Sequence, residues 1–244
     1  MNEIGVRLAQ VQERIYRAAA RAGRNPNDIT LVAVTKTWPV ETVLRAYEAG
    51  LRHFGENRAE QLADKRAAVE AALGADSGVV WHQIGTLQSR KTQFVADCAD
   101  VFHALDRLKI GRRLSHRLIK NGRTLPVFVE VNVSGEASKS GLRCARWEED
   151  ATQQQSVRNA FEAIVALPGL RLQGLMTMAP WGTDENTIRA VFHRTRELAQ
   201  WLQTAVPDAD LTSLSMGMTD DFELAIEEGA THIRVGRAIF GPRH

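Results

Sequence analysis

Short apolar runs alternate with helical patterns along almost the whole chain. The eight runs are Leu31–Thr35, His53–Gly55, Val79–Ile84, Val101–Leu105, Val127–Val133, Leu170–Met176, Leu211–Ser215 and His232–Val235. The helical patterns between them are Val40–Ala49, Arg58–Leu73, Thr92–Ala96, Ile110–Ile119, Val157–Leu167, Thr187–Thr204 and Asp220–Glu228. Strands that alternate with helices build parallel sheets, so eight such units predict an α/β fold, a (β/α)₈ TIM barrel. An open doubly wound sheet is the alternative, although the sequence marks no topological switch point for it.

A further helix precedes the first run. Ile4, Leu8, Val11 and Ile15 recur at helical spacing, and Gly23 with the turn residues after it ends the pattern. No linker, repeat or low-complexity stretch interrupts the 244 residues. We therefore expect residues 1–244 to form one domain, a single barrel with an extra N-terminal helix.

Composition argues against several classes of function. A hydrophobic content of 44% and a charged content of 25% are typical of a soluble globular protein. The net charge of +2 is spread along the chain, so we expect neither a nucleic acid nor a membrane as partner. Cys98 and Cys144 lie far apart and provide neither a metal-ligand pair nor a disulfide framework. With no membrane-spanning run and no signal-peptide core, we expect a cytoplasmic protein.

Lys36 directly follows the first apolar run. Active sites of (β/α)₈ barrels lie at the C-terminal ends of the strands, and Pro39 marks the start of the next helix. A lysine with a lowered pKa at that position forms a Schiff base with an aldehyde. A solvated lysine at a strand end is the alternative.

Glycine-containing turns follow the last two runs. Ser215-Met216-Gly217-Met218-Thr219 leads into a helix start, and in Arg234-Val235-Gly236-Arg237 the glycine lets backbone amides approach a ligand. The loops after strands seven and eight of such barrels commonly bind a phosphate. Tight turns alone would explain either segment, but finding both at the two expected strand ends favours a phosphate site.

A lysine on the first strand and a phosphate site on the last two predict an aldehyde ligand that carries a phosphate. Pyridoxal 5'-phosphate fits, since it needs a Schiff-base lysine, a phosphate site and a partner for its pyridine nitrogen. Arg234 is the candidate partner, and because arginine stays charged it would donate to an unprotonated nitrogen. Such a ring is a weaker electron sink, which argues against transamination. A salt bridge at the barrel mouth is the alternative role of Arg234.

Several segments together resemble the pyridoxal phosphate homeostasis protein family, the YggS-type or proline synthetase co-transcribed proteins. They are Ala33–Lys36, Phe54–Asn57, Trp81–Gln88, Asn132–Gly141, Ser215–Asp221 and Arg234–Gly241. They follow one another in the family's order from about residue 30 to the C-terminus. The resemblance implies a barrel like the N-terminal domain of alanine racemase, with covalently bound pyridoxal phosphate.

The resemblance also implies roles for particular residues. Lys36 forms the Schiff base and Arg234 faces the ring nitrogen. The remaining cofactor-binding residues are Ser215, Gly217, Gly236 and Arg237 on the phosphate side, where Arg237 acts through its backbone, and Asn57 and Met176 as lining residues.

Four residues need separate comment. Arg90 stands where the family usually has asparagine, and Arg237 stands where a hydroxyl residue is common, so a side-chain contact at each position is in question. Glu56 has the chemistry of a general base, although a helix cap or a salt bridge is the expected role. His82 is expected to pack in the core rather than to bind a metal, because no metal-ligand spacing surrounds it.

Three classes of function remain. The first is a carrier or regulator that holds pyridoxal phosphate, serves vitamin B6 homeostasis and passes the cofactor to dependent apo-enzymes. The second is a pyridoxal phosphate enzyme such as an amino-acid racemase, and the third is a barrel aldolase that uses Lys36 directly. Alanine racemases need a second domain and a tyrosine base, whereas the tyrosines here, Tyr16 and Tyr47, fall in helical patterns. We therefore expect a non-catalytic carrier, active as a monomer, with no metal.

Overall fold

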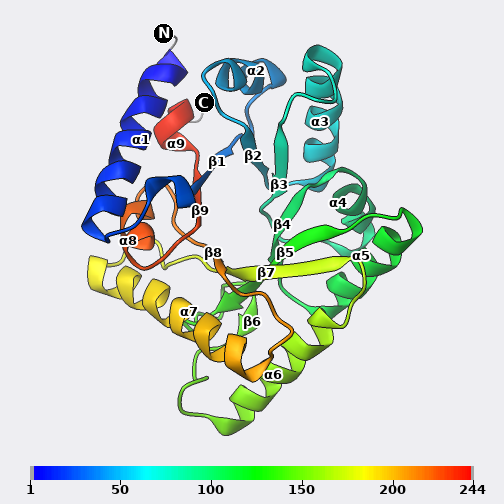
Figure 1. Cartoon of the computed structure of the whole chain (residues 1–244), viewed down its shortest axis with the longest axis vertical. Coiled ribbons are helices and arrows are strands. Elements are labelled where there is room, and N and C mark those ends of the chain that lie inside the picture. Colours follow the sequence, from blue (N-terminus) through cyan, green and yellow to red (C-terminus); the bar gives the residue numbers. More distant parts are fainter. Residues whose placement is uncertain (1–2, 243–244) are drawn as a thin grey trace.

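Eight parallel strands close into a barrel in the computed structural model, which describes residues 3–242 (Figure 1). The barrel strands are β1 (Thr30–Val34), β2 (His53–Glu56), β3 (Val80–Gln83), β4 (Val101–Leu105), β5 (Leu125–Asn132), β7 (Leu170–Met176), β8 (Ser213–Ser215) and β9 (His232–Val235). Each strand pairs in parallel with its neighbours, and the pairing of β4 with β5 closes the ring. The closed sheet confirms the predicted (β/α)₈ barrel and excludes the open doubly wound sheet.

Helices cover the outside of the barrel (Figure 1). They are α1 (Glu3–Arg21), α2 (Val40–Glu48), α3 (Ala59–Leu73), α4 (Thr92–Cys98), α5 (Leu108–Lys120), α6 (Ala151–Val165), α7 (Glu185–Ala205), α8 (Phe222–Glu227) and α9 (Arg237–Phe240), with 3-10 turns at Pro26–Asp28 and Ser89–Lys91. Helix α6 begins earlier than the predicted residue 157, because the Asp150 side chain caps it by accepting from the amides of Thr152 and Gln153. Helix α9 was not predicted, since four residues are too few to show a period.

A two-residue strand, β6 (Leu142–Arg143), pairs with the end of β5 outside the barrel. The Asn132 side chain holds the loop between them: its Nδ2 donates to the carbonyl of Glu136 at 2.8 Å, and its Oδ1 accepts from the amide of Gly135 at 2.9 Å. A polar side chain thus holds the loop that leads to β6, and a strand of two residues shows no apolar pattern, so the sequence did not predict it.

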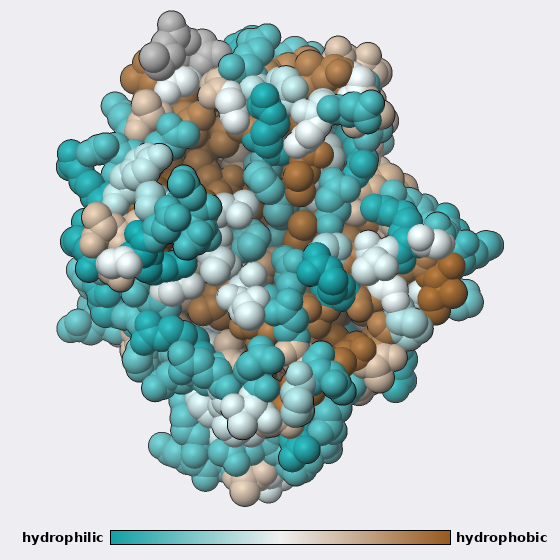
Figure 2. Space-filling view, viewed as in Figure 1, coloured by the Kyte–Doolittle hydropathy of each residue, from teal (hydrophilic) through white to brown (hydrophobic). Residues whose placement is uncertain are grey.

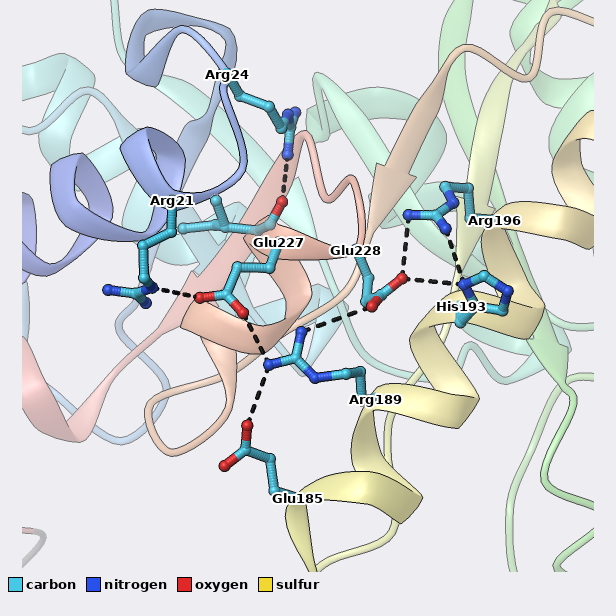
Figure 3. A network of polar contacts seen from close by, with 9 residues as sticks. Arg21, Arg24, Glu185, Arg189, His193, Arg196, Glu227 and Glu228 are labelled. Carbon is cyan, nitrogen blue, oxygen red and sulfur yellow. Dashed lines mark hydrogen bonds and ion pairs between the residues drawn. The ribbon is translucent and has the colours of Figure 1, made fainter.

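The N-terminal helix α1 packs against α8 and α9, so the first and last helices of the barrel lie side by side (Figure 1). Figure 3 shows the polar network that joins α1, α7 and α8. In it, Glu227 accepts from Arg21 at 2.7 Å and from Arg189 at 2.8 Å. Arg24 adds hydrogen bonds to the carbonyls of Ile226 and Ala230, both at 2.8 Å. These contacts fix α1 across the seam where β9 returns to β1.

The surface shown in Figure 2 is mostly hydrophilic, with apolar residues in separate patches between the charged ones. None of the helices within residues 3–242 is long and apolar enough to cross a membrane. Cys98 and Cys144 are both free, as expected.

Candidate functional site

A cavity of about 360 Å³ opens at the C-terminal ends of the strands. Six of the eight predicted cofactor-binding residues line it: Lys36, Asn57, Met176, Arg234, Gly236 and Arg237. The other lining residues are Val34, Ile84, Gly85, Thr86, Glu130, Met178, Trp181, Met218, Thr219 and Asp220. The fold therefore brings together residues from both ends of the chain, at the position that (β/α)₈ barrels use for their sites.

Lys36 lies two residues beyond the end of β1, directly after Thr35, and is half-buried at the rim of the cavity. The next residue, Thr37, has φ 72° and is the one non-glycine residue of the described chain with positive φ. A β-branched residue in that region is strained, and such strain concentrates at functional sites. Beyond it, Trp38 contacts Phe240 of α9 with ring centroids 6.0 Å apart. This contact anchors the loop that carries the lysine on the side of α9.

A buried ion pair lies directly behind this loop. The Lys65 Nζ of α3 lies 2.5 Å from the Glu56 Oε1 of β2 and donates to the Thr35 carbonyl at 2.8 Å. The Thr35 hydroxyl donates to the same Glu56 oxygen at 2.7 Å. Glu56 is thus a salt-bridge residue, as expected, and it holds the backbone immediately before Lys36.

Arg234 is a buried cation held by two neutral acceptors. Its guanidinium donates to the Ser215 hydroxyl at 2.6 Å and to the carbonyl of Thr177 at 2.9 Å. Desolvation lowers the pKa of Arg234 to about 10, opposed by the charges of Asp221 and Glu130. Among the described residues, neither carboxylate hydrogen bonds to the guanidinium. Its charge is therefore available to a ligand in the cavity.

Ser215 and Gly217 are not among the residues that line the cavity. The Ser215 hydroxyl is fully buried beneath it, between Arg234 and His103. Gly217, with φ 93°, packs against α8 so closely that a Cβ would lie 2.6 Å from the Cβ of Ala225. That these two residues contact a cofactor directly stays a prediction; the structure shows Ser215 contacting Arg234.

Thr219, Glu130 and Trp181 also line the cavity, although no ligand-binding role was predicted for them. Thr219 places a hydroxyl on the β8–α8 loop, beside Asp220, which forms an ion pair with Arg237. Trp181 stands at the cavity with 88% of its surface exposed. The position of Thr219 between a strand and a helix could have indicated that it lies at the cavity. A tryptophan in a turn, such as Trp181, belongs to no sequence pattern that predicts its place.

Glu130 on β5 is the buried carboxylate of the lining, with 2% of its surface exposed. Its Oε2 atom has no hydrogen-bond partner within the described residues. Desolvation, with a contribution from the charge of Asp106, raises the pKa of Glu130 to about 7, against the opposing effect of Arg234. A group with this pKa exchanges a proton near neutral pH, and strong pKa shifts in cavities are typical of functional sites.

Histidines from three successive strands form a chain beneath Ser215. The ring nitrogens of His53 and His82 are 3.0 Å apart, those of His82 and His103 are 2.8 Å apart, and His103 Nδ1 lies 2.7 Å from the Ser215 hydroxyl. Burial lowers the pKa of His82 and that of His103 well below the usual value. His82 is the expected core histidine, but its part in this chain was not predicted. No cluster of the described residues could hold a metal ion.

The sequence profile of the alanine racemase N-terminal domain family matches residues 6–244. The chain is 41% identical over 246 residues to the pyridoxal phosphate homeostasis protein of Escherichia coli K12, covering 100% of this chain and 98% of that protein. The chain belongs to the pyridoxal phosphate homeostasis protein family. Another family member, from Pseudomonas aeruginosa, is 43% identical over 243 residues, which cover 100% of this chain and 97% of that protein.

Solved structures of this family share the barrel. PipY of Synechococcus elongatus, with pyridoxal phosphate bound, matches with a TM-score of 0.80 and 32% identity, covering 98% of this chain and 100% of that one. Alanine racemase of Clostridium difficile matches with a TM-score of 0.65 and 11% identity, covering 95% of this chain and 56% of that one. The second likeness shows the fold alone, and it confirms the expected resemblance to the racemase barrel.

Proposed function

We propose that this protein binds pyridoxal 5'-phosphate through a Schiff base on Lys36 and serves vitamin B6 homeostasis as a carrier rather than as a catalyst. The observation that carries the proposal is the meeting of Lys36, Arg234 and the Gly236–Arg237 turn in one cavity. The names of its relatives and the pyridoxal phosphate bound to PipY support it. In forming the bond, the amine nitrogen adds to the aldehyde carbon, and water leaves.

The cavity fits the cofactor in size and in chemistry. A volume of about 360 Å³ suits a small ligand. Arg234 offers N–H donors and a charge without a direct carboxylate partner, which suits an unprotonated ring nitrogen. We assign the phosphate to the hydroxyl of Thr219, the backbone at Gly236 and the guanidinium of Arg237, because these groups line the rim together. Asn57 and Met176 then line the cofactor.

Reductive trapping tests the proposal. Incubation with pyridoxal phosphate should give a yellow protein, and borohydride should fix the cofactor on the peptide that contains Lys36. The variant Lys36→Ala should give no adduct, whereas Lys109→Ala, at an exposed lysine of α5, should label like the unmodified protein. An unlabelled protein, or labelling that survives Lys36→Ala, would refute the assignment.

The second candidate function is a pyridoxal phosphate enzyme such as an amino-acid racemase, and Glu130 is the observation that favours it. Its strand β5 lies opposite β1 in the eight-stranded ring, so Glu130 and Lys36 approach the cavity from opposite sides. A racemase needs proton-transfer groups on two faces of its substrate. The tyrosines do not supply one, because neither Tyr16 nor Tyr47 lines the cavity. Racemisation of L-amino acids that is lost in Glu130→Gln would establish this reading.

For its partners, we propose that the protein hands pyridoxal phosphate to apo-enzymes in the cytoplasm as a monomer, with residues 1–244 acting as one domain. The two free cysteines agree with a reducing compartment. Reactivation of a pyridoxal phosphate-dependent apo-enzyme by the loaded protein, faster than by the same amount of free cofactor, would support delivery. Sedimentation analysis of the loaded protein tests the monomer.

A further inference from the structure

A column of polar side chains crosses the barrel from one face to the other. It starts at His53, at the first residue of β2, where the ring borders a surface crevice lined by Gln12, Tyr16 and Asn27. It continues through His82 and His103 and ends at Ser215, the last residue of β8. Arg234 extends it into the cavity.

Arg234 fixes the direction of every hydrogen bond in this column. A guanidinium has N–H donors and no acceptor, so the Ser215 oxygen must accept from it. If Ser215 also accepted from His103, its own proton would have no acceptor among the described neighbours, a cost of about 1–3 kcal/mol for a buried donor. Ser215 therefore donates to the Nδ1 atom of His103.

The tautomers of the three histidines follow from that first donation. His103 accepts at Nδ1, so its proton is on Nε2, which donates to His82 Nδ1. His82 in turn donates from Nε2 to His53 Nδ1. His53 is half-buried beside the crevice, so its own Nε2 proton can reach water. All three rings are then neutral, which agrees with the burial that disfavours their charged forms.

The surroundings of His103 keep its ring in place. The ring stacks on Phe128 of β5 with centroids 4.5 Å apart. His232 of β9 stands edge-on to it at 5.9 Å, and its hydrogen bond goes to the hydroxyl of its neighbour Thr231. His232 thus packs beside the column and takes no part in its hydrogen bonds.

We infer that His103, acting through Ser215, is a positioning residue that aims the Arg234 guanidinium at the ring of the bound cofactor. The inference rests on the proposed function. Two neutral acceptors hold the Arg234 guanidinium, so its orientation is fixed without a direct hydrogen bond to a carboxylate. A hydroxyl that donates to His103 is also a better acceptor for Arg234, because linked hydrogen bonds strengthen one another.

Substitutions at His103 separate positioning from packing. In His103→Phe the ring can still stack on Phe128, but Ser215 loses its acceptor; in His103→Asn a side-chain oxygen near Nδ1 can replace it. We expect His103→Phe and Ser215→Ala to shift the absorption band of the bound cofactor and to weaken its binding roughly fivefold, the effect of one neutral hydrogen bond. His103→Asn should restore the band. His116→Gln, at an exposed histidine of α5, is the control.

A second measurement needs no cofactor. Nitrogen-15 NMR of the histidines in the unloaded protein should show His53, His82 and His103 as neutral Nε2–H tautomers. An Nδ1–H tautomer at His103, or an absorption band that is the same in His103→Phe and the unmodified protein, would overturn the inference. Failure of the unmodified protein to bind pyridoxal phosphate, with the expected tautomers present, would refute the proposed function and the cofactor role inferred from it, but not the direction of the column.

Discussion

The ammonium group of Lys65 lies 2.8 Å from the carbonyl oxygen of Thr35, the residue that precedes Lys36. The same ammonium pairs with the Glu56 carboxylate, and both side chains are buried. Because a buried charge that loses its partner is costly, this pair couples the stability of the barrel to the placement of Lys36.

Removing one member of the pair should therefore destabilise the protein strongly. We expect Lys65→Met to lower the free energy of unfolding by about 3–5 kcal/mol, since Glu56 would remain buried without its partner. The double variant Lys65→Met with Glu56→Gln should recover a large part of the loss. Urea denaturation measures both. Lys91→Met, which breaks the more exposed pair with Glu60, should cost less than about 1 kcal/mol.

Relieving the backbone strain at Thr37 should stabilise the fold. Thr37→Gly removes the side chain that disfavours φ 72°, and we expect a gain of about 0.5–1 kcal/mol after the entropic cost of glycine. Thr37→Val keeps the β-branch and should give no gain. A looser loop should also slow borohydride trapping on Lys36. If Thr37→Gly and Thr37→Val unfold at the same urea concentration, strain at this residue does not contribute.

Glu130 should make stability depend on pH. Its pKa is raised from 4.5 to about 7 in the folded state, so folding favours the protonated form. The stabilisation is fully present below the unfolded pKa near 4.5 and is lost as the pH rises to about 7, a change of about 3 kcal/mol. Glu130→Gln should therefore stabilise the protein at pH 8 and have little effect at pH 4.5, when urea midpoints are compared.

The control for this prediction is Glu149→Gln, at an exposed carboxylate before α6. It should leave the difference between the two pH values unchanged. A Glu130→Gln profile that runs parallel to that of the unmodified protein would mean that Glu130 titrates normally.

The ion pair of Asp220 with Arg237 should compete with the phosphate of the cofactor. Both side chains are more than half exposed and line the cavity rim. We expect Asp220→Asn to tighten pyridoxal phosphate binding about two- to threefold, because it frees Arg237 and removes a negative charge from the rim. Arg237→Ala should weaken binding. Equilibrium dialysis at two salt concentrations measures both changes, and equal affinities in all three proteins would place the phosphate elsewhere.

Much of the fold was predictable because its signals are local. Each barrel strand is an apolar run, and helices such as α2 and α8 end two residues before Gly50 and Gly229, which have φ values of 102° and 101°. The start of α6 and the strand β6 were missed because single polar side chains, Asp150 and Asn132, determine them. One such side chain gives no periodic signal.

The site was predictable to the extent that it lies at strand ends. Lys36, Arg234 and Gly236 follow directly from that rule, and all three line the cavity. The hydroxyl of Ser215 points to a different partner because the rule places a residue along its strand but does not set the direction of its side chain. The role of His103 was not predictable for the same reason: its hydrogen bond to Ser215 crosses the barrel between strands that are 112 residues apart in sequence.

The strand order also sets when the pocket can form during synthesis. β1 lies between β2 and β9, so the first strand of the chain acquires its second neighbour only when the last strand has been made. A growing chain in which β9 has not yet been synthesised contains Lys36 but lacks Arg234, Gly236 and the contact of Phe240 with Trp38. A nascent chain should therefore be unable to capture the cofactor until β9 has left the ribosome and paired with β1.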